Sequence, residues 1–136
     1  MNKITHLSKR FAKWIRVKEK LHSNQVNRPH VTESEVWWIS FGENIGSEIN
    51  GKGPLFTRPG IVFKKLTGNK FLTLPTTSQI KLGSWYVPVQ YGDHAVCVIL
   101  SEARIVDTRR LTSRVGRLNA SEFKKVKEGF KQLYLK

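Results

Sequence analysis

Two segments of the chain carry side chains that could hold and break a phosphodiester. The first runs from Glu48 to Arg58, contains glycines, and ends in an arginine followed by a proline. Pro59 biases Arg58 toward an extended backbone, which places its guanidinium at the start of a strand. The second is Leu74-Pro75-Thr76-Thr77-Ser78-Gln79, in which hydroxyl and amide groups at a strand end can donate to phosphate oxygens. Taken singly, an arginine before a proline is usually a surface residue, and a threonine pair usually belongs to a cap or turn.

These groups suit the cleavage of RNA, because RNA carries its own nucleophile. The ribose 2′-hydroxyl can attack the adjacent phosphorus if the protein moves protons and stabilises the extra negative charge. Arginine suits the second task through its fixed fork of donors and its permanent charge. DNA lacks this hydroxyl, so a site of this kind would be selective for RNA.

Other chemistries find little support in the residue pattern. The four histidines, His6, His22, His30 and His94, have no metal-ligand spacing. The 10 acidic residues are too scattered for a two-metal phosphodiesterase. The sequence also lacks a Walker loop, a GxGxxG motif and a GxSxG motif. We therefore expect a site that uses no metal and no cofactor.

Charge is the strongest compositional signal. The 136 residues include 24 Lys and Arg against 10 Asp and Glu, a formal net charge of +14. A field of this size concentrates polyanions, so nucleic acid is the expected partner, ahead of an acidic protein or a membrane surface. The plainer interpretation, that the charge merely keeps the protein soluble, stays open.

The cysteine content and the hydropathy pattern indicate the compartment. The single Cys97 lies in an apolar run and is expected to be a core residue, since it has no partner for a disulfide. No apolar run approaches the length that spans a bilayer, and the first residues lack the apolar stretch of a signal peptide. We expect a cytoplasmic protein that does not enter a membrane.

Short β-rich runs fill the middle of the chain, and helices are expected at both ends. The first helix should be basic and amphipathic, running from Ile4 to Leu21, with docking on its own domain favoured over contact with RNA or a membrane. The last should begin after Asn119, an N-cap with Glu122 three residues later. Strands are expected at 36–41, 60–65, 70–74, 85–89, 95–100, 104–106 and 115–118, with a linker at 22–32, a long loop at 42–57 and a tight turn at 67–69. This pattern predicts a basic helix and linker at 1–33 and a small antiparallel barrel domain at 34–136.

Three stretches resemble the MazF/PemK/Kid toxins of type II toxin–antitoxin systems. They read EVWWISFGENIGSEINGKGPLFTRPGIVF, FLTLPTTSQIK and VILSEARIVDTRRL, and a closing helix follows them. The resemblance covers roughly Glu35 to Leu135, with the motifs in the family's order and at suitable spacing. It implies a mainly β (α+β) fold, an SH3-like barrel of short antiparallel strands with a C-terminal helix. The N-terminal basic amphipathic helix lies outside this shared core.

The resemblance also implies an activity and partners. It points to a homodimeric, metal-independent, sequence-specific endoribonuclease that cuts single-stranded RNA (mRNA) and leaves a cyclic phosphate and a 5′-hydroxyl. A cognate antitoxin would neutralise it by placing an acidic or apolar segment in the RNA groove.

Individual residues take expected roles from the same resemblance. Arg58 matches the arginine of the family's RP motif and would take part in proton transfer and stabilise the pentavalent phosphorus. Thr77 matches the threonine that would hydrogen-bond the scissile phosphate. Glu48 matches an acid that would act as a base or orient Arg58. The remaining expected contacts to RNA are Lys52, Ser78, Gln79, Lys81 and Arg104.

The sequence departs from the family's pattern in several places. Residues 53–56 lengthen the loop before the arginine, and Gly60 replaces a branched aliphatic residue, which we expect to weaken the strand slightly. Ile99 and Ser101 stand where some relatives have an arginine and an aspartate. Farther along, Asp107 is expected to form a structural ion pair with Arg109 or Arg110, and Arg104 could also serve structure or contact a dimer partner.

Two other functions remain possible on the sequence alone. A catalytically inactive barrel of the same fold could bind RNA, stacking bases on Trp37, Trp38, Trp85 and Tyr86. Because strand alternation turns at least one residue of the adjacent Trp37–Trp38 pair inward, both cannot be ligands. A DNA-binding regulator is disfavoured, since the sequence shows no helix-turn-helix pattern.

Overall fold

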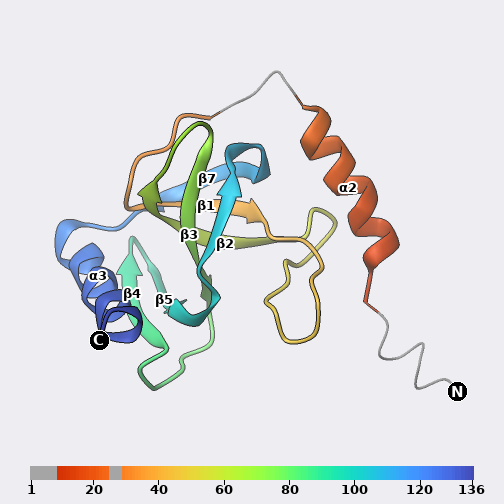
Figure 1. Ribbon diagram of the computed structural model, residues 1–136. Coiled ribbons are helices and arrows are strands. Elements are labelled where there is room, and N and C mark those ends of the chain that lie inside the picture. Colours follow the sequence, from red (N-terminus) through yellow and green to blue (C-terminus); the bar gives the residue numbers. More distant parts are fainter. Residues whose placement is uncertain (1–8, 25–28) are drawn as a thin grey trace, which may run out of the picture.

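The computed structural model describes residues 9–24 and 29–136, and Figure 1 shows a β-sheet core between two helices. The N-terminal helix is α2 (Phe11–Ser23) and the C-terminal helix is α3 (Ala120–Tyr134). The strands are β1 (Glu35–Ser40), β2 (Thr57–Lys65), β3 (Lys70–Thr77), β4 (Tyr86–Tyr91), β5 (His94–Ile99), β6 (Arg104–Asp107) and β7 (Leu111–Arg117). Two short 3₁₀ helices, η1 (Leu100–Glu102) and η2 (Thr108–Arg110), lie on either side of β6.

The strands form one antiparallel sheet in the order β4-β5-β3-β2-β1-β7, with β6 added to β3. β3 is the central strand, because residues 70–75 pair with β2 and β6, whereas Thr76 and Thr77 pair with Val98 and Cys97 of β5. In the described part of the chain no pairing joins β4 to β7, so the barrel is open. The predicted architecture of short antiparallel strands with a C-terminal helix is confirmed.

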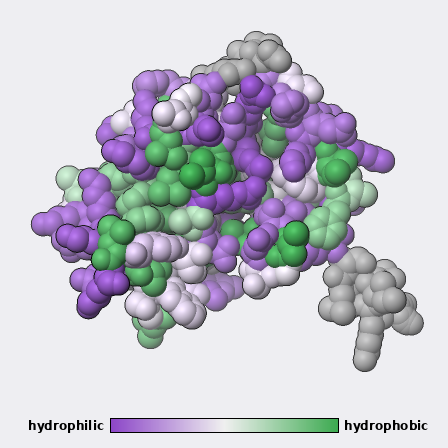
Figure 2. Space-filling view, viewed as in Figure 1, coloured by the Kyte–Doolittle hydropathy of each residue, from purple (hydrophilic) through white to green (hydrophobic). Residues whose placement is uncertain are grey.

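The core consists of two apolar clusters in the described residues. α3 inserts Phe123 and Val126 into the larger cluster, against residues of β4 and β5. The smaller cluster includes Ile39, Phe41 and Phe71. Cys97 is fully buried, as its apolar setting predicts. On the face shown in Figure 2, hydrophilic side chains predominate and apolar side chains form several separate groups.

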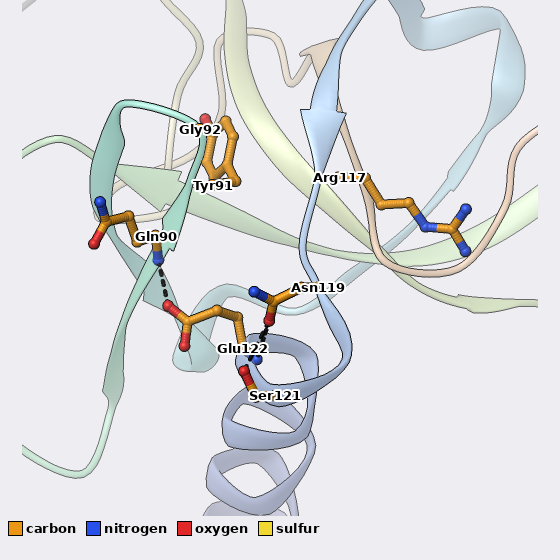
Figure 3. A pocket seen from close by; sticks show the side chains of 7 residues that line it. All are labelled: Gln90, Tyr91, Gly92, Arg117, Asn119, Ser121 and Glu122. Carbon is orange, nitrogen blue, oxygen red and sulfur yellow. Dashed lines mark hydrogen bonds between the residues drawn. The ribbon is translucent and has the colours of Figure 1, made fainter.

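The C-terminal helix begins where the sequence predicts, at the Asn119 N-cap. The side-chain oxygen of Asn119 accepts the backbone N–H of Glu122 at 2.9 Å. The Glu122 carboxylate does not return to Asn119 as in a full capping box. It accepts the backbone N–H of Gln90 at 2.8 Å, as Figure 3 shows, and pairs with Lys125. The N-terminus of α3 is thereby fixed to the β4–β5 hairpin.

Gly60 fits its position closely, which corrects the expectation that it merely weakens the strand. A Cβ atom at this residue would lie 2.8 Å from the Ile39 side chain and 2.8 Å from the Thr73 hydroxyl. Thr73 is buried and donates to the carbonyl of Ile61 at 2.8 Å. Glycine therefore lets β1, β2 and β3 pack closely just beside Arg58.

The predicted strands differ from the observed bounds by up to two residues at most ends, and by three or four residues at one end of β2, β3 and β7. β2 begins at Thr57 instead of 60, and β3 continues to Thr77 instead of ending at 74, because its last two residues pair with β5. β7 begins at Leu111 instead of 115, and two register shifts in its pairing with β1 disturb the alternation on which the prediction relied.

Trp14 is the buried residue of the N-terminal helix, whereas Phe11 and Ile15 of the predicted apolar stripe are exposed. Ile4 and Leu7, and residues 25–28 of the predicted linker, lie outside the residues that the structure describes. No helix in the described ranges is long and apolar enough to span a bilayer.

Candidate active site

A pocket of about 540 Å³ opens where the start of β2 lies beside the end of β3. Five of the eight residues predicted to act on RNA line it: Lys52, Arg58, Thr77, Ser78 and Gln79. A mostly aromatic and aliphatic wall comes from β1, the β4–β5 hairpin and β7, through Trp38, Tyr91, His94, Val96 and Val115. The pocket thus combines a cationic and hydroxyl-bearing side with a side suited to the flat face of a base.

Arg58 is held in place by two backbone carbonyls. Its Nε donates to the carbonyl of Asn50 at 2.9 Å, and its Nη1 makes a long contact of 3.5 Å to the carbonyl of Thr76. Burial lowers the pKa of Arg58 from its ordinary value, and the negative charge of Glu102 opposes this shift. An arginine remains charged at neutral pH despite such a shift. The N–H groups that are not engaged by these carbonyls are available to an anion in the pocket.

The two neighbouring threonines have different surroundings. The hydroxyl of Thr76 is buried and donates to the carbonyl of Pro59 at 3.1 Å, which ties the end of β3 to the start of β2. Thr77 is half-buried at the pocket, and its hydroxyl oxygen accepts the backbone N–H of Gln79 at 3.2 Å. Because this contact uses Thr77 as an acceptor, its O–H remains free to donate to a phosphate oxygen.

Lys52 reaches the pocket through a short backbone ladder. Its N–H donates to the carbonyl of Thr57 at 2.8 Å, and the N–H of Thr57 donates back at 2.9 Å. Gly53, which follows with a φ of 72°, permits the reversal that closes this ladder. Lys52 therefore pairs with Thr57, the residue before Arg58, and both Lys52 and Arg58 line the pocket.

Lys81 lies away from the pocket. Its ammonium is 5.9 Å from the ring centroid of Tyr86, and its backbone N–H lies near the Cys97 sulfur, on the connection between β3 and β4.

Glu48 and Arg104 line a second pocket of about 340 Å³, together with Asn44, Ile49, Glu102 and Ala103. Arg104 donates to the carbonyl of Phe41 at 2.9 Å. Burial lowers the pKa of Arg104, and Glu48 opposes that shift. The Glu48 carboxylate accepts the N–H of Ile45 at 3.1 Å. Glu48 thus acts electrostatically on Arg104, while the carboxylate that acts on Arg58 is that of Glu102.

The predicted ion pair near η2 is present. Arg109 Nε lies 3.8 Å from Asp107 Oδ1, and the same oxygen accepts the backbone N–H of Arg109 at 2.8 Å.

Sequence reasoning missed His94, Tyr91 and Glu102. The His94 ring packs on Tyr91, with the ring centroids 5.0 Å apart, and both residues reach the pocket because β5 pairs with the end of β3. That pairing joins segments far apart in the sequence, so no local pattern marked these residues. Glu102 accepts the N–H of Ile49 at 3.0 Å, a contact across 53 positions. In the described ranges no three His, Cys, Asp or Glu side chains gather as metal ligands would.

Comparisons with known proteins place this chain in a family. A model of the family described as "PemK-like, MazF-like toxin of type II toxin-antitoxin system" matches residues 32–134, most of the chain. No curated protein sequence matches.

Solved structures have the same fold. MazF from Deinococcus radiodurans superposes with a TM-score of 0.64 at 21% identity, covering 79% of this chain and all (100%) of that one. A MazE–MazF structure from the same organism gives a TM-score of 0.57 at 18% identity, covering 77% of this chain and 96% of that one. An endoribonuclease in complex with its cognate antitoxin, from a mycobacterial species, gives 0.59 at 10% identity over 76% and 93%.

Proposed function

The chain belongs to the PemK-like, MazF-like toxins of type II toxin–antitoxin systems, and we propose that it acts as an endoribonuclease that cuts single-stranded RNA without a metal ion. One observation carries the proposal. The guanidinium of Arg58 contacts the carbonyl of the peptide that links Thr76 to Thr77, in a pocket lined by Arg58 and by the Thr77 hydroxyl. A cation and a hydroxyl donor from different strands can therefore reach one phosphate.

The proposed reaction is an internal transesterification. The ribose 2′-oxygen forms a bond to phosphorus, the bond from phosphorus to the 5′-oxygen breaks, and a 2′,3′-cyclic phosphate and a 5′-hydroxyl result. One proton leaves the 2′-hydroxyl and one reaches the departing 5′-oxygen. Arg58 and Thr77 donate to the non-bridging oxygens, which carry more negative charge in the transition state than in the substrate.

Two groups are candidates to take the proton from the 2′-hydroxyl. The family resemblance indicates Glu48, which lines the neighbouring pocket, and the geometry adds His94, which lines the same pocket as Arg58. An imidazole can accept and donate a proton in turn. If His94 is the base, His94→Ala should lower kcat by about 10²–10⁴, while Glu48→Gln keeps kcat near that of the wild type. The opposite result would assign the proton transfer to Glu48.

The RNA is proposed to lie across both sides of the pocket. Lys52, Ser78 and Gln79 would contact phosphates and sugars beside the cleaved bond, while the aromatic wall receives a base. Lys81 and Arg104 lie outside the pocket, so any contact that they make would be to flanking nucleotides. The sequence specificity would then depend on the loop residues that border the base.

The proposed partners follow from the relatives and from the charge. Structures of similar chains include MazE–MazF and an endoribonuclease with its cognate antitoxin. We propose that an antitoxin covers this pocket, with acidic side chains against Lys52 and Arg58 or apolar ones against Trp38 and Val115. We also propose a homodimer, which sedimentation of the purified protein would test.

The direct test is cleavage of a long single-stranded RNA by the purified protein in a metal chelator. We expect discrete fragments with 5′-hydroxyl ends, and sequencing those ends would give the cleavage motif. A DNA strand of the same sequence should stay intact, because it lacks the 2′-hydroxyl. Intact RNA under conditions where the protein binds it would reject the nuclease and favour an inactive RNA-binding barrel.

A further inference from the structure

The helix α2 lies before the segment that matches the family model, and its Trp14 and the two residues just before the helix contact one loop. This loop, which we call the β1–β2 loop, comprises residues 41–56 and lies beside α2 in Figure 1. It supplies Lys52 and Gly53 to the candidate active site and Asn50 to Arg58. Any group that fixes the loop therefore also fixes part of the site.

The residues just before α2 hold this loop by hydrogen bonds. The ammonium of Lys9 donates to the carbonyls of Asn44 at 2.6 Å and Gly46 at 2.8 Å. The backbone N–H of Arg10 donates to the Glu43 carboxylate at 2.8 Å, and its guanidinium donates to the carbonyl of Gly53 at 3.2 Å. Both ends of the loop are thus attached to the same short segment.

Trp14 adds an apolar contact to the same loop. A Cβ atom on Gly42 would lie 2.4 Å from the Trp14 ring, so the indole packs directly on the backbone at the start of the loop. The ring of Phe56, at the loop's other end, lies 5.5 Å from that of Trp14 between centroids. The Arg10 guanidinium lies 4.1 Å from the centroid of Phe56. Phe56 is buried and has a φ of 54°, which is strained for a non-glycine residue.

A short series of hydrogen bonds joins Lys9 to Arg58. The Asn44 carbonyl accepts from Lys9, while the Asn44 side chain donates to the carbonyl of Ile49 at 2.7 Å. The Asn44 backbone N–H donates to the side chain of Asn50. The Asn50 carbonyl then accepts the Nε–H of Arg58 at 2.9 Å.

We propose that Lys9, Arg10 and Trp14 form a clamp that holds the β1–β2 loop in the shape that orients Arg58 for reaction. They are positioning residues, because they touch the loop and not the reacting atoms. The catalytic consequence rests on the proposed nuclease function, whereas the effect on the loop does not. The far end of α2 is attached separately, since Arg109 donates to the carbonyl of His22 at 3.0 Å. A change at Lys9 can therefore loosen the loop while the helix stays docked.

The test compares Lys9→Ala with Lys13→Ala in the full chain. Lys13 is exposed on α2, so its substitution removes the same charge near the same surface. We expect Lys9→Ala to lower kcat about ten- to hundredfold, as misplacement of a reacting group does, with KM changed less than about twofold. Lys13→Ala should leave both near the wild-type values, and Lys9→Arg, which can donate to the same carbonyls, should restore most of kcat. A loss in Lys9→Ala no larger than that in Lys13→Ala, or one confined to KM, would overturn the clamp.

A second measurement does not require activity. The N–H of Gly51 donates to the carbonyl of Gly42 at 2.8 Å, inside the loop. Its hydrogen exchange, and that of the Arg58 Nε–H, should be faster in Lys9→Ala than in Lys13→Ala. If the wild-type protein cuts no RNA but these rates differ as expected, the nuclease proposal fails and the clamp stands. Equal rates in the two variants would reject the clamp whether or not the protein is a nuclease.

Discussion

Replacement of Arg58 by lysine should abolish most RNA cleavage while it preserves the fold and the formal charge. The Arg58 guanidinium both binds backbone carbonyls and is proposed to donate to the RNA phosphate. Its Nε and Nη1 are engaged by the carbonyls of Asn50 and Thr76, which fixes the plane of the guanidinium, and the residue lines the pocket. An ammonium is a single point charge, so it cannot satisfy both carbonyls and also present an oriented pair of donors to the phosphate.

The size of the effect follows from the number of donors lost. Removal of one donor to a developing oxyanion typically lowers the rate by about 10²–10³, or about 2.7–4 kcal/mol. The lysine at Arg58→Lys would keep the attraction to the phosphate but lose the second donor and the fixed direction, so we expect kcat to fall by about 10². Arg58→Ala loses the charge as well and should fall by about 10³ or more. KM should change less, because Lys52 and Gln79 remain to bind the RNA.

The assay is single-turnover cleavage of a fluorescent RNA oligonucleotide that contains the mapped site, at saturating protein and in chelator. Arg16→Lys, the same substitution on the exposed face of α2, is the matched control and should cleave like the wild type. Thermal unfolding of all variants checks the fold. If Arg58→Lys cleaves within about threefold of the wild type, the guanidinium fork contributes less than about 1 kcal/mol and the role given to Arg58 is wrong.

Three further expectations concern the same region. Thr77→Val should lower kcat by about 10² with little change in melting temperature. Thr76→Val should keep the activity but lower the free energy of unfolding by about 1 kcal/mol, because the buried hydroxyl of Thr76 donates to the carbonyl of Pro59. Equal behaviour of the two variants would contradict the assignment of the pocket-facing hydroxyl. Gly60→Ala should lower the free energy of unfolding, measured by chemical denaturation, by about 1–3 kcal/mol, since the added methyl would meet Ile39 and Thr73. An unchanged denaturation midpoint would mean that β1, β2 and β3 can move apart at Gly60 without loss of stability. Affinity of the Arg58→Ala protein for single-stranded RNA, measured by anisotropy, should still fall about tenfold or more between about 50 and 200 mM salt, whereas a flat dependence would exclude the basic surface as the binding site.

The part of the site that the sequence predicted is the part built from neighbouring strands. Arg58 and Thr77 lie on β2 and β3, which a tight turn at residues 67–69 joins into a hairpin with Gly60 opposite Pro75. A hairpin sets the register of its strands near the turn, so the start of β2 and the end of β3 come close together, although a register shift between Val62 and Lys64 moves the pairing by one residue. The meeting of the two segments therefore followed from local patterns, even though each pattern alone is common.

The aromatic wall of the pocket was not predictable in this way. His94 and Tyr91 reach it because Thr77 pairs with Cys97, a contact between strands that no short turn connects. The shape of the β1–β2 loop was equally hidden, because it depends on side-chain bonds from Asn44 and Asn50 and on the strained backbone of Phe56. Sequence periodicity carries information on which face of a strand is buried. It carries none on which distant carbonyl an asparagine will bind.

The placement of the carboxylates bears on how the site would stabilise charge. Glu102, fixed by the N–H of Ile49, opposes the effect of burial on Arg58, and Glu48 does the same for Arg104. Each of these two half-buried arginines thus has one acid whose charge favours its ionised form, yet no salt bridge joins either arginine to a carboxylate within residues 9–24 and 29–136. A direct ion pair would occupy the donors that an RNA phosphate needs, whereas an acid acting from a distance leaves them free. Carbonyl groups orient Arg58 and a remote carboxylate supports its charge, so the guanidinium can be both rigid and available, which is the condition for stabilising a transition state without reorganisation.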